Sequence, residues 1–333
     1  MIHAPRPGNR PGPQSHSRAA GHGHAPDRSS AIDPLRLMLA VAVLALHTGL
    51  PDAAPALVRQ GLVNGLYRLA VPVFALISGF FFLGAVRHGR AGAYLSRIVM
   101  LYALWMMLYL PRYAPAIEDA RHAVQQVLVG YFHLWFLPGM ILAAALIWAL
   151  SRLGAGGRVI ALVAGLAAAA GLGMQFLVLS GRIQIPLDYY RNGAFVIFPF
   201  FAVGYLLALW RDRLMAWRPS LGVVALALAA VVGESLWWFW IAGGGYGVDI
   251  MATLLIAAPV LFWAAFQRQG LADGKRIAGM AAFVYFIHIH VMFEASRLGL
   301  SGDAKFLFVL VVSLGLSWLL ATIAGGRLIR AVT

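Results

Sequence analysis

The sequence predicts an all-α, polytopic integral membrane protein with about ten transmembrane helices and with both termini in the cytoplasm. Composition is the first reason: 61% of the 333 residues are hydrophobic and only 11% are charged, whereas soluble domains carry about 45–50% apolar and about 25% charged residues. A soluble globule of this size could not cover its surface with so few charges. The same hydrophobicity excludes disorder for most of the chain.

Recurring apolar stretches separated by polar breaks are the second reason. All of them should be helices, because a segment in lipid must satisfy its own backbone hydrogen bonds. The expected spans lie near residues 34–50, 62–83, 94–111, 133–151, 158–179, 193–210, 220–240, 248–266, 277–295 and 305–325.

Residues 1–31 differ from the rest of the chain, because they are rich in Pro, Gly, Arg and His and lack the apolar core of a signal peptide. We expect a disordered cytoplasmic tail over 1–31 and one transmembrane domain over 32–333.

The distribution of basic residues is the third reason. With a cytoplasmic N-terminus and ten spans, 17 Lys and Arg fall on the cytoplasmic side and 7 on the outer side. This bias favours an even number of spans with both termini inside. The expected location is multi-pass, in a bacterial inner membrane. The net charge of +14 is explained in the same way, so we expect no nucleic-acid partner. There is no Cys, which excludes a thiol acyl-enzyme and Cys-ligated metal.

Charged and titratable residues inside spans are candidates for a functional site, because they are costly in lipid. Arg36 and His47 are eleven residues apart, which rotates a helix about 20° beyond three turns and advances it by about 16 Å. The two side chains should therefore share one face, with Arg36 near the inner surface and His47 near the outer one. Alternatively, Arg36 extends to the lipid headgroups and His47 lies near water at the helix end.

Other polar groups divide by depth. The inner group is Ser78, Arg90 and Arg97, and the outer group is Arg68, His133, Trp135, Glu234, Asp249, His288, His290 and Glu294. His288 and His290 are about 200° apart on a helix, so they should not face the same pocket. For any single member, the alternative is a buried residue whose polar atoms are satisfied by its neighbours.

Six motifs in a fixed order make the sequence similar to the acyltransferase-3 family of membrane-bound acyltransferases. They are Ile32-Asp33-Pro34-Leu35-Arg36 with His47, the run from Pro72 to Ser78-Gly79-Phe80, Tyr94-Leu95-Ser96-Arg97, His133-Leu134-Trp135, Arg191-Asn192-Gly193 with Phe198-Pro199-Phe200-Phe201, and Tyr285-Phe286-Ile287-His288. One departure concerns a second Arg that many members carry three residues after the first, where this chain has Met100.

The resemblance implies ten core helices, a cytoplasmic acyl-CoA donor, commonly acetyl-CoA, and a hydroxyl acceptor on a cell-surface or exported glycan. A polysaccharide synthesis or export machinery is the expected partner, and no metal is expected. The expected catalytic residues are His47, His288 and Glu234. Acyl-CoA would be bound by Arg36, Arg90, Arg97 and Ser78, and the acceptor by Arg68, His133, Trp135 and Tyr285.

These expectations lead to a chemical hypothesis. Arginines on the cytoplasmic side suit the phosphates of CoA, and a neutral His farther out suits a general base. We expect His47 to deprotonate the acceptor hydroxyl, which attacks the thioester, while an acyl-His intermediate remains an alternative. Two other functions also fit the sequence, namely a secondary transporter or flippase and a non-catalytic membrane subunit of a polysaccharide assembly.

Overall fold

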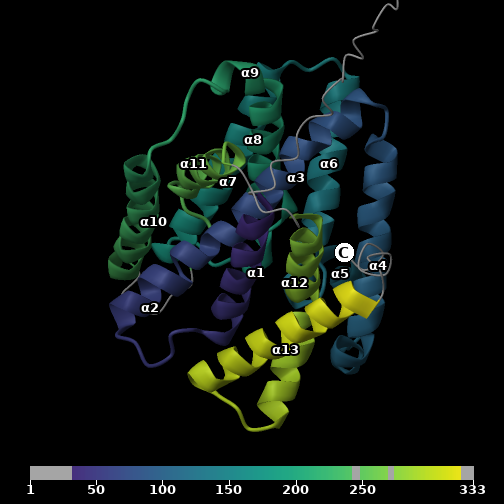
Figure 1. Ribbon diagram of the computed structural model, residues 1–333, viewed down its shortest axis with the longest axis vertical. Coiled ribbons are helices and arrows are strands. Elements are labelled where there is room, and N and C mark those ends of the chain that lie inside the picture. The colour runs from purple at the N-terminus through teal and green to yellow at the C-terminus, as the bar shows by residue number, and fades with distance from the viewer. Residues whose placement is uncertain (1–31, 242–247, 269–273, 324–333) are drawn as a thin grey trace, which may run out of the picture.

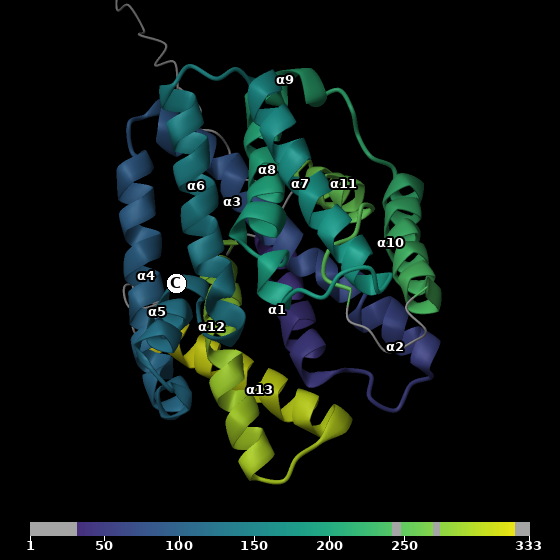
Figure 2. The same ribbon diagram turned by 180° about the vertical axis from the view of Figure 1, so that it is seen from behind.

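The computed structural model describes residues 32–241, 248–268 and 274–323, and the tail predicted over 1–31 lies outside these ranges. Within them the chain forms helices and turns and no strand, so the all-α prediction is confirmed. The helices form an elongated bundle in which α4 and α6 lie along one edge and α10 along the other (Figures 1 and 2).

Ten helices correspond to the expected spans. They are α1 (Ile32–Thr48), α3 (Ala70–Arg87), α4 (Ala91–Tyr113), α6 (Phe136–Arg152), α7 (Gly157–Leu179), α8 (Phe198–Leu209), α10 (Leu221–Ile241), α11 (Leu254–Phe266), α12 (Gly274–Arg297) and α13 (Gly302–Ile323). The shorter elements are α2 (Ala56–Val63), η1 (Leu66–Leu69), η2 (Ala114–Ala116), α5 (Ala120–Val129), η3 (Phe132–Trp135), η4 (Leu187–Tyr189), the π-helical η5 (Gly193–Ile197) and α9 (Arg211–Leu214).

Seven of the helical segments in the described residues are long and apolar enough to cross a membrane. The expected spans at 34–50, 193–210 and 248–266 correspond to shorter helices, namely α1 with 17 residues, Gly193–Leu209 and Leu254–Phe266. The count of about ten spans and the cytoplasmic position of both termini therefore stay predictions.

Helices α3 and α8 approach each other closely through two glycines. A Cβ on Gly79 would lie 1.9 Å from the carbonyl oxygen of Phe201, and one on Gly204 would lie 1.9 Å from that of Leu76. Small residues permit this backbone contact between membrane helices. Gly79 of the Ser-Gly motif therefore has a packing role, and it fixes α3, which carries Ser78, against the centre of the bundle.

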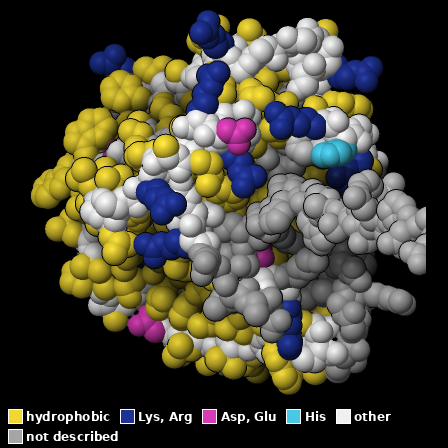
Figure 3. All heavy atoms as spheres, turned by 45° about the horizontal axis from the view of Figure 1, so that its top comes forward, with side chains coloured by type: hydrophobic (Ala, Val, Ile, Leu, Met, Phe, Trp, Pro, Cys, Tyr) yellow, Lys and Arg dark blue, Asp and Glu magenta, His cyan; other side chains and the backbone are white. Residues whose placement is uncertain are grey.

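Basic residues gather at one end of the bundle, where α3 is followed by α4, where α6 is followed by α7, and at α9 (Figure 1). The residues concerned are Arg87, Arg90, Arg152, Arg158, Arg211 and Arg213. Figure 3 turns this end forward and shows many Lys and Arg side chains and few Asp or Glu side chains on it, beside an extensive hydrophobic flank. Helix α1 carries His47 near its C-terminal end, away from this basic end.

Candidate active site

Two cavities lie inside the bundle, and Tyr285 of α12 borders both of them. The smaller one, here called the histidine cavity, has a volume of about 70 Å³. Its polar lining residues are His47, Tyr67, Arg68, His133, Trp135, Arg191, Asp249 and Tyr285. The other, here called the large cavity, has a volume of about 460 Å³. Its lining includes Arg36, Phe74, Ser78, Tyr94, Arg97, Phe136 and Tyr285.

His47 and His288 meet where α1 packs along α12. Their rings are nearly parallel, with centroids 5.2 Å apart and planes 10° apart, and they meet edge to edge, because His47 Nδ1 lies 2.9 Å from His288 Nε2. His288 is fully buried, whereas His47 borders the histidine cavity. The structure thus brings together two histidines that are 241 residues apart in sequence.

The hydrogen bonds fix which nitrogen carries the proton in each neutral ring. His288 Nδ1 lies 2.6 Å from the Tyr285 carbonyl oxygen and 3.2 Å from that of Val284, so it must be the protonated nitrogen, because carbonyls only accept. His288 Nε2 is then an acceptor, and His47 Nδ1–H donates to it. The free lone pair of His47 is therefore on Nε2, which is the arrangement of a general base with an orienting partner.

His133 of η3 lies beside this pair, with its ring centroid 5.0 Å from that of His288 and 6.5 Å from that of His47. Its side chain is 2% exposed, and neither ring nitrogen has a hydrogen-bond partner of normal geometry within the described residues. The Tyr285 hydroxyl donates to the His133 carbonyl at 2.8 Å. His290, in contrast, stacks on Tyr109 at 3.8 Å, which confirms that it does not face the same pocket as His288.

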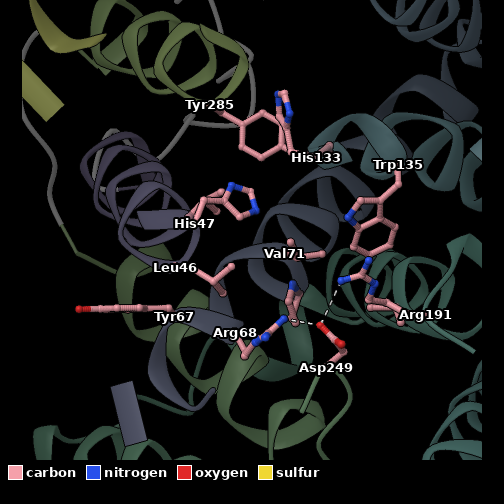
Figure 4. Close-up of a pocket in the computed structure, with 13 residues that line it drawn as sticks. Leu46, His47, Tyr67, Arg68, Val71, His133, Trp135, Arg191, Asp249 and Tyr285 are labelled. Atoms are coloured by element: carbon pink, nitrogen blue, oxygen red, sulfur yellow. Dashed lines mark hydrogen bonds and ion pairs between the residues drawn. The ribbon is translucent and has the colours of Figure 1, made fainter. Parts of the chain in front are cut away.

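Three charged groups line the side of the histidine cavity opposite His133 and Tyr285 (Figure 4). Arg68 of η1 donates to Asp249 and, through Nη2, to Asn64 at 2.9 Å. The Arg191 guanidinium forms an ion pair with the same oxygen of Asp249 at 3.5 Å and lies over the Trp135 ring at 5.7 Å. One carboxylate is thus shared by two guanidinium groups.

Side chains from two other helices hold the segment that carries Asp249. The Gln175 side chain of α7 accepts from the Asp249 and Ile250 amides at 3.2 and 2.9 Å. Glu234 of α10 accepts from the backbone amides of Ala252 and Thr253 at 2.8 and 2.7 Å. Glu234 is absent from both cavity linings, and its hydrogen bonds to these amides hold the backbone that follows Asp249.

Arg191 lies in the loop before η5, where its backbone amide donates to the Leu187 carbonyl at 2.8 Å. Asn192 caps η5, because its side-chain oxygen accepts from the amides of Ala194 and Phe195 at 3.0 and 3.2 Å. Burial raises the pKa of the Tyr190 hydroxyl, and the nearby Asp249 carboxylate adds to this effect. Tyr190 is therefore neutral at physiological pH and adds no charge beside the cavity.

The large cavity holds three of the four residues predicted to bind acyl-CoA, namely Arg36, Arg97 and Ser78. Arg36 donates to the buried Asp33 at 2.7 Å. Arg90 is exposed at the start of α4 and lies outside this lining. The Met100 side chain is 71% exposed, so the position of the missing second Arg is on the outer surface of α4.

Most of the predicted site residues therefore fall into two groups. His47, Arg68, His133, Trp135 and Tyr285 line the histidine cavity, with His288 directly behind His47. The sequence marked Asp249 as a charged residue of the outer group and Arg191 as part of a motif, but neither was assigned a role, and the structure places both in the histidine cavity. Among the described residues, no group of three or more side chains is arranged to hold a metal ion.

The chain is similar to one protein family and, over part of its length, to two curated proteins. A model of the acyltransferase-3 family, described as an acyltransferase domain, matches residues 29–322. Two curated proteins named amino-acid racemase, both from Enterococcus faecalis, are 26% identical over alignments of 141 and 137 residues, and these alignments cover 38% and 37% of this chain.

The match covers only 20% and 19% of the two racemases, so the chain spans about a fifth of the length of these relatives. The name amino-acid racemase belongs to those proteins as wholes. No solved structure matches the chain. Because the family model spans nearly all of the residues from α1 to α13, the chain belongs to the acyltransferase-3 family.

Proposed function

We propose that the protein is an O-acyltransferase of the bacterial inner membrane, which moves an acyl group, acetyl in the simplest case, from cytoplasmic acyl-CoA to a hydroxyl of a cell-surface or exported glycan. The observation that carries this proposal is the meeting of two cavities at Tyr285, one with arginines and the other with an oriented histidine pair.

The large cavity suits the donor. Its volume of about 460 Å³ falls within the range of pockets for small molecules and cofactors. Arg36 and Arg97 offer guanidinium groups to phosphate, and the rest of the lining is largely apolar. The basic end of the bundle supports a cytoplasmic entrance for this cavity.

The histidine cavity suits the acceptor hydroxyl. His47 Nε2 takes the hydroxyl proton as the oxygen attacks the thioester carbonyl. The carbon–sulfur bond then breaks, and the leaving CoA thiolate recovers the proton from His47. His288 orients His47 through the 2.9 Å hydrogen bond and offsets part of the charge that His47 gains. Glu234 has no direct part in this scheme.

Tyr285 lies where donor and acceptor have to meet, because it is the residue that the two linings share. Its ring packs against Phe74 and Phe136, with centroids 6.1 and 5.9 Å away. The thioester would pass this aromatic group to reach His47. We infer that the group limits the access of water to the thioester until an acceptor is bound.

Labelled acetyl-CoA offered to inside-out membrane vesicles tests the proposal. We expect alkali-labile label in glycan, and mass spectrometry should show that surface glycan from a deletion strain loses the corresponding acetyl ester. Uptake or movement of a glycan without any transfer of label would instead support the transporter or flippase alternative.

A further inference from the structure

The charges of the histidine cavity do not balance. Among the described residues, its lining contains the guanidinium groups of Arg68 and Arg191 and the single carboxylate of Asp249, which leaves one positive charge. The side chains of Arg68, Arg191 and Asp249 are 17%, 31% and 9% exposed. An uncompensated charge in such a water-poor place is unfavourable unless an anion pairs with it.

The two guanidinium groups also have unused donors. The Nε atoms of Arg68 and Arg191 are buried and have no hydrogen-bond partner among the described residues. Arg68 is held by direct hydrogen bonds to Asp249 and Asn64, whereas the ion pair of Arg191 with Asp249 is looser, at 3.5 Å. Arg191 is therefore the guanidinium group better placed to bind a ligand.

We propose that Arg191, supported by Arg68, binds a carboxylate of a substrate in the histidine cavity, so that the acylated molecule or the acyl group is acidic. The cavity of about 70 Å³ has room for a group of a few heavy atoms, since one water occupies about 30 Å³ in the liquid. Guanidinium–carboxylate geometry gives strong, oriented hydrogen bonds.

A carboxylate at this position would also stabilise the positive charge that His47 gains when it takes the hydroxyl proton, because His47 lines the same cavity.

The inference rests on the proposed function for the identity of the reacting hydroxyl. The carboxylate has two chemical sources, namely a uronic acid unit of the acceptor or the distal end of a dicarboxylic acyl group.

Binding of two matched sugars to the full-length protein in detergent tests the inference without relying on turnover. Methyl glucuronide and methyl glucoside differ only in having a carboxylate or a CH₂OH group. We expect methyl glucuronide to bind about 10- to 100-fold more tightly, as for a hydrogen bond to a charged group. Arg191→Gln should abolish the preference, and Arg191→Lys should restore part of it.

The matched control is Arg182→Gln, which removes an exposed Arg outside both cavity linings and should bind like the wild type. Asp249→Asn should have the opposite effect to Arg191→Gln. It leaves a charge of +2 on the lining, so folded protein with this change should prefer methyl glucuronide more strongly than the wild type does. Equal affinity for both sugars, or a preference that survives Arg191→Gln, would contradict the idea that the carboxylate belongs to the acceptor.

Succinyl-CoA and butyryl-CoA, compared as donors, test the other source. If the acyl group carries the carboxylate, succinyl transfer should be preferred in an Arg191-dependent way while the two sugars bind equally. No preference in either arm would overturn the inference and leave the proposed acyl transfer intact. Failure of the protein to transfer any acyl group, combined with Arg191-dependent binding of methyl glucuronide, would instead refute the proposed function and keep the carboxylate site.

Discussion

The two cavities differ in size and in how their charges are held. The large cavity has about 460 Å³ and carries Arg36 and Arg97 in a mainly apolar lining. The histidine cavity has about 70 Å³ and contains two guanidinium groups, a carboxylate and His47, which is oriented by His288. In the proposed function, this difference corresponds to binding a large donor in one cavity and holding a small reacting group in a fixed geometry in the other.

The two cavities also differ in how firmly their lining residues are held in place. Arg97 comes from one exposed face of α4, whereas the Asp249 segment is tied to α7 by Gln175 and to α10 by Glu234. Groups that take part in chemistry need precise positions, and groups that bind a long ligand tolerate more motion. Substitutions in the histidine cavity should therefore affect kcat, and those in the large cavity should affect the KM for acyl-CoA.

The largest effect is expected from His47→Ala. Loss of the general base should lower kcat by about 10²- to 10⁴-fold, measured as transfer of labelled acetyl from acetyl-CoA in vesicles. The control is His88→Ala, because His88 is exposed near the basic end of the bundle. Wild-type activity in correctly folded His47→Ala protein would remove His47 from the mechanism.

Two separate variants, Arg97→Gln and Arg36→Lys, test the donor side. Arg36→Lys keeps a positive charge beside Asp33. Removal of a charge-assisted hydrogen bond to phosphate at Arg97 should raise the KM for acyl-CoA by about 10- to 100-fold with a smaller change in kcat. Arg36→Lys should have a weaker effect of the same kind. Arg90→Gln is the comparison, since Arg90 lies outside the cavity; an equal rise in its KM would place CoA elsewhere.

His288 is tested as a positioning residue. His288→Ala removes the acceptor of the His47 Nδ1–H bond and should lower kcat by about tenfold, with little change in the KM for acyl-CoA. His288→Gln, whose side-chain oxygen can accept the same hydrogen, should recover part of the loss. A merely structural role would give no such recovery, and kcat would then follow the melting temperature of the two variants.

The smallest effect is expected from Tyr285→Phe, which keeps the ring between the cavities and removes the 2.8 Å hydrogen bond to His133. The free energy of unfolding should fall by about 1 kcal/mol, and transfer should change only a few-fold.

Tyr285→Ala removes the ring as well and should raise acyl-CoA hydrolysis in the absence of acceptor. If hydrolysis stays at the wild-type level in Tyr285→Ala, the ring does not control access of water to the thioester.

Several site residues were predictable because a charged side chain in an apolar span has few alternatives to a function. Arg36, His47 and Arg68 stand out in this way, and helical periodicity correctly separated His288 from His290. Glu234 stands out for the same reason, yet its oxygens accept hydrogen bonds from Ala252 and Thr253. Rarity in the sequence therefore marks a residue without telling whether it faces a cavity or a backbone segment.

The sequence by itself determined the helical membrane architecture, because every span must satisfy its own backbone and so leaves a hydrophobic pattern that can be counted. It also determined the family, because six motifs occur along the chain in the order expected for the acyltransferase-3 family, and the family model matches residues 29–322. Only the tertiary structure decided that His47 donates to His288 and that Arg191 and Asp249 share a cavity with His47. These contacts join residues far apart in sequence, so their geometry depends on the packing of whole helices and is not encoded in any local pattern.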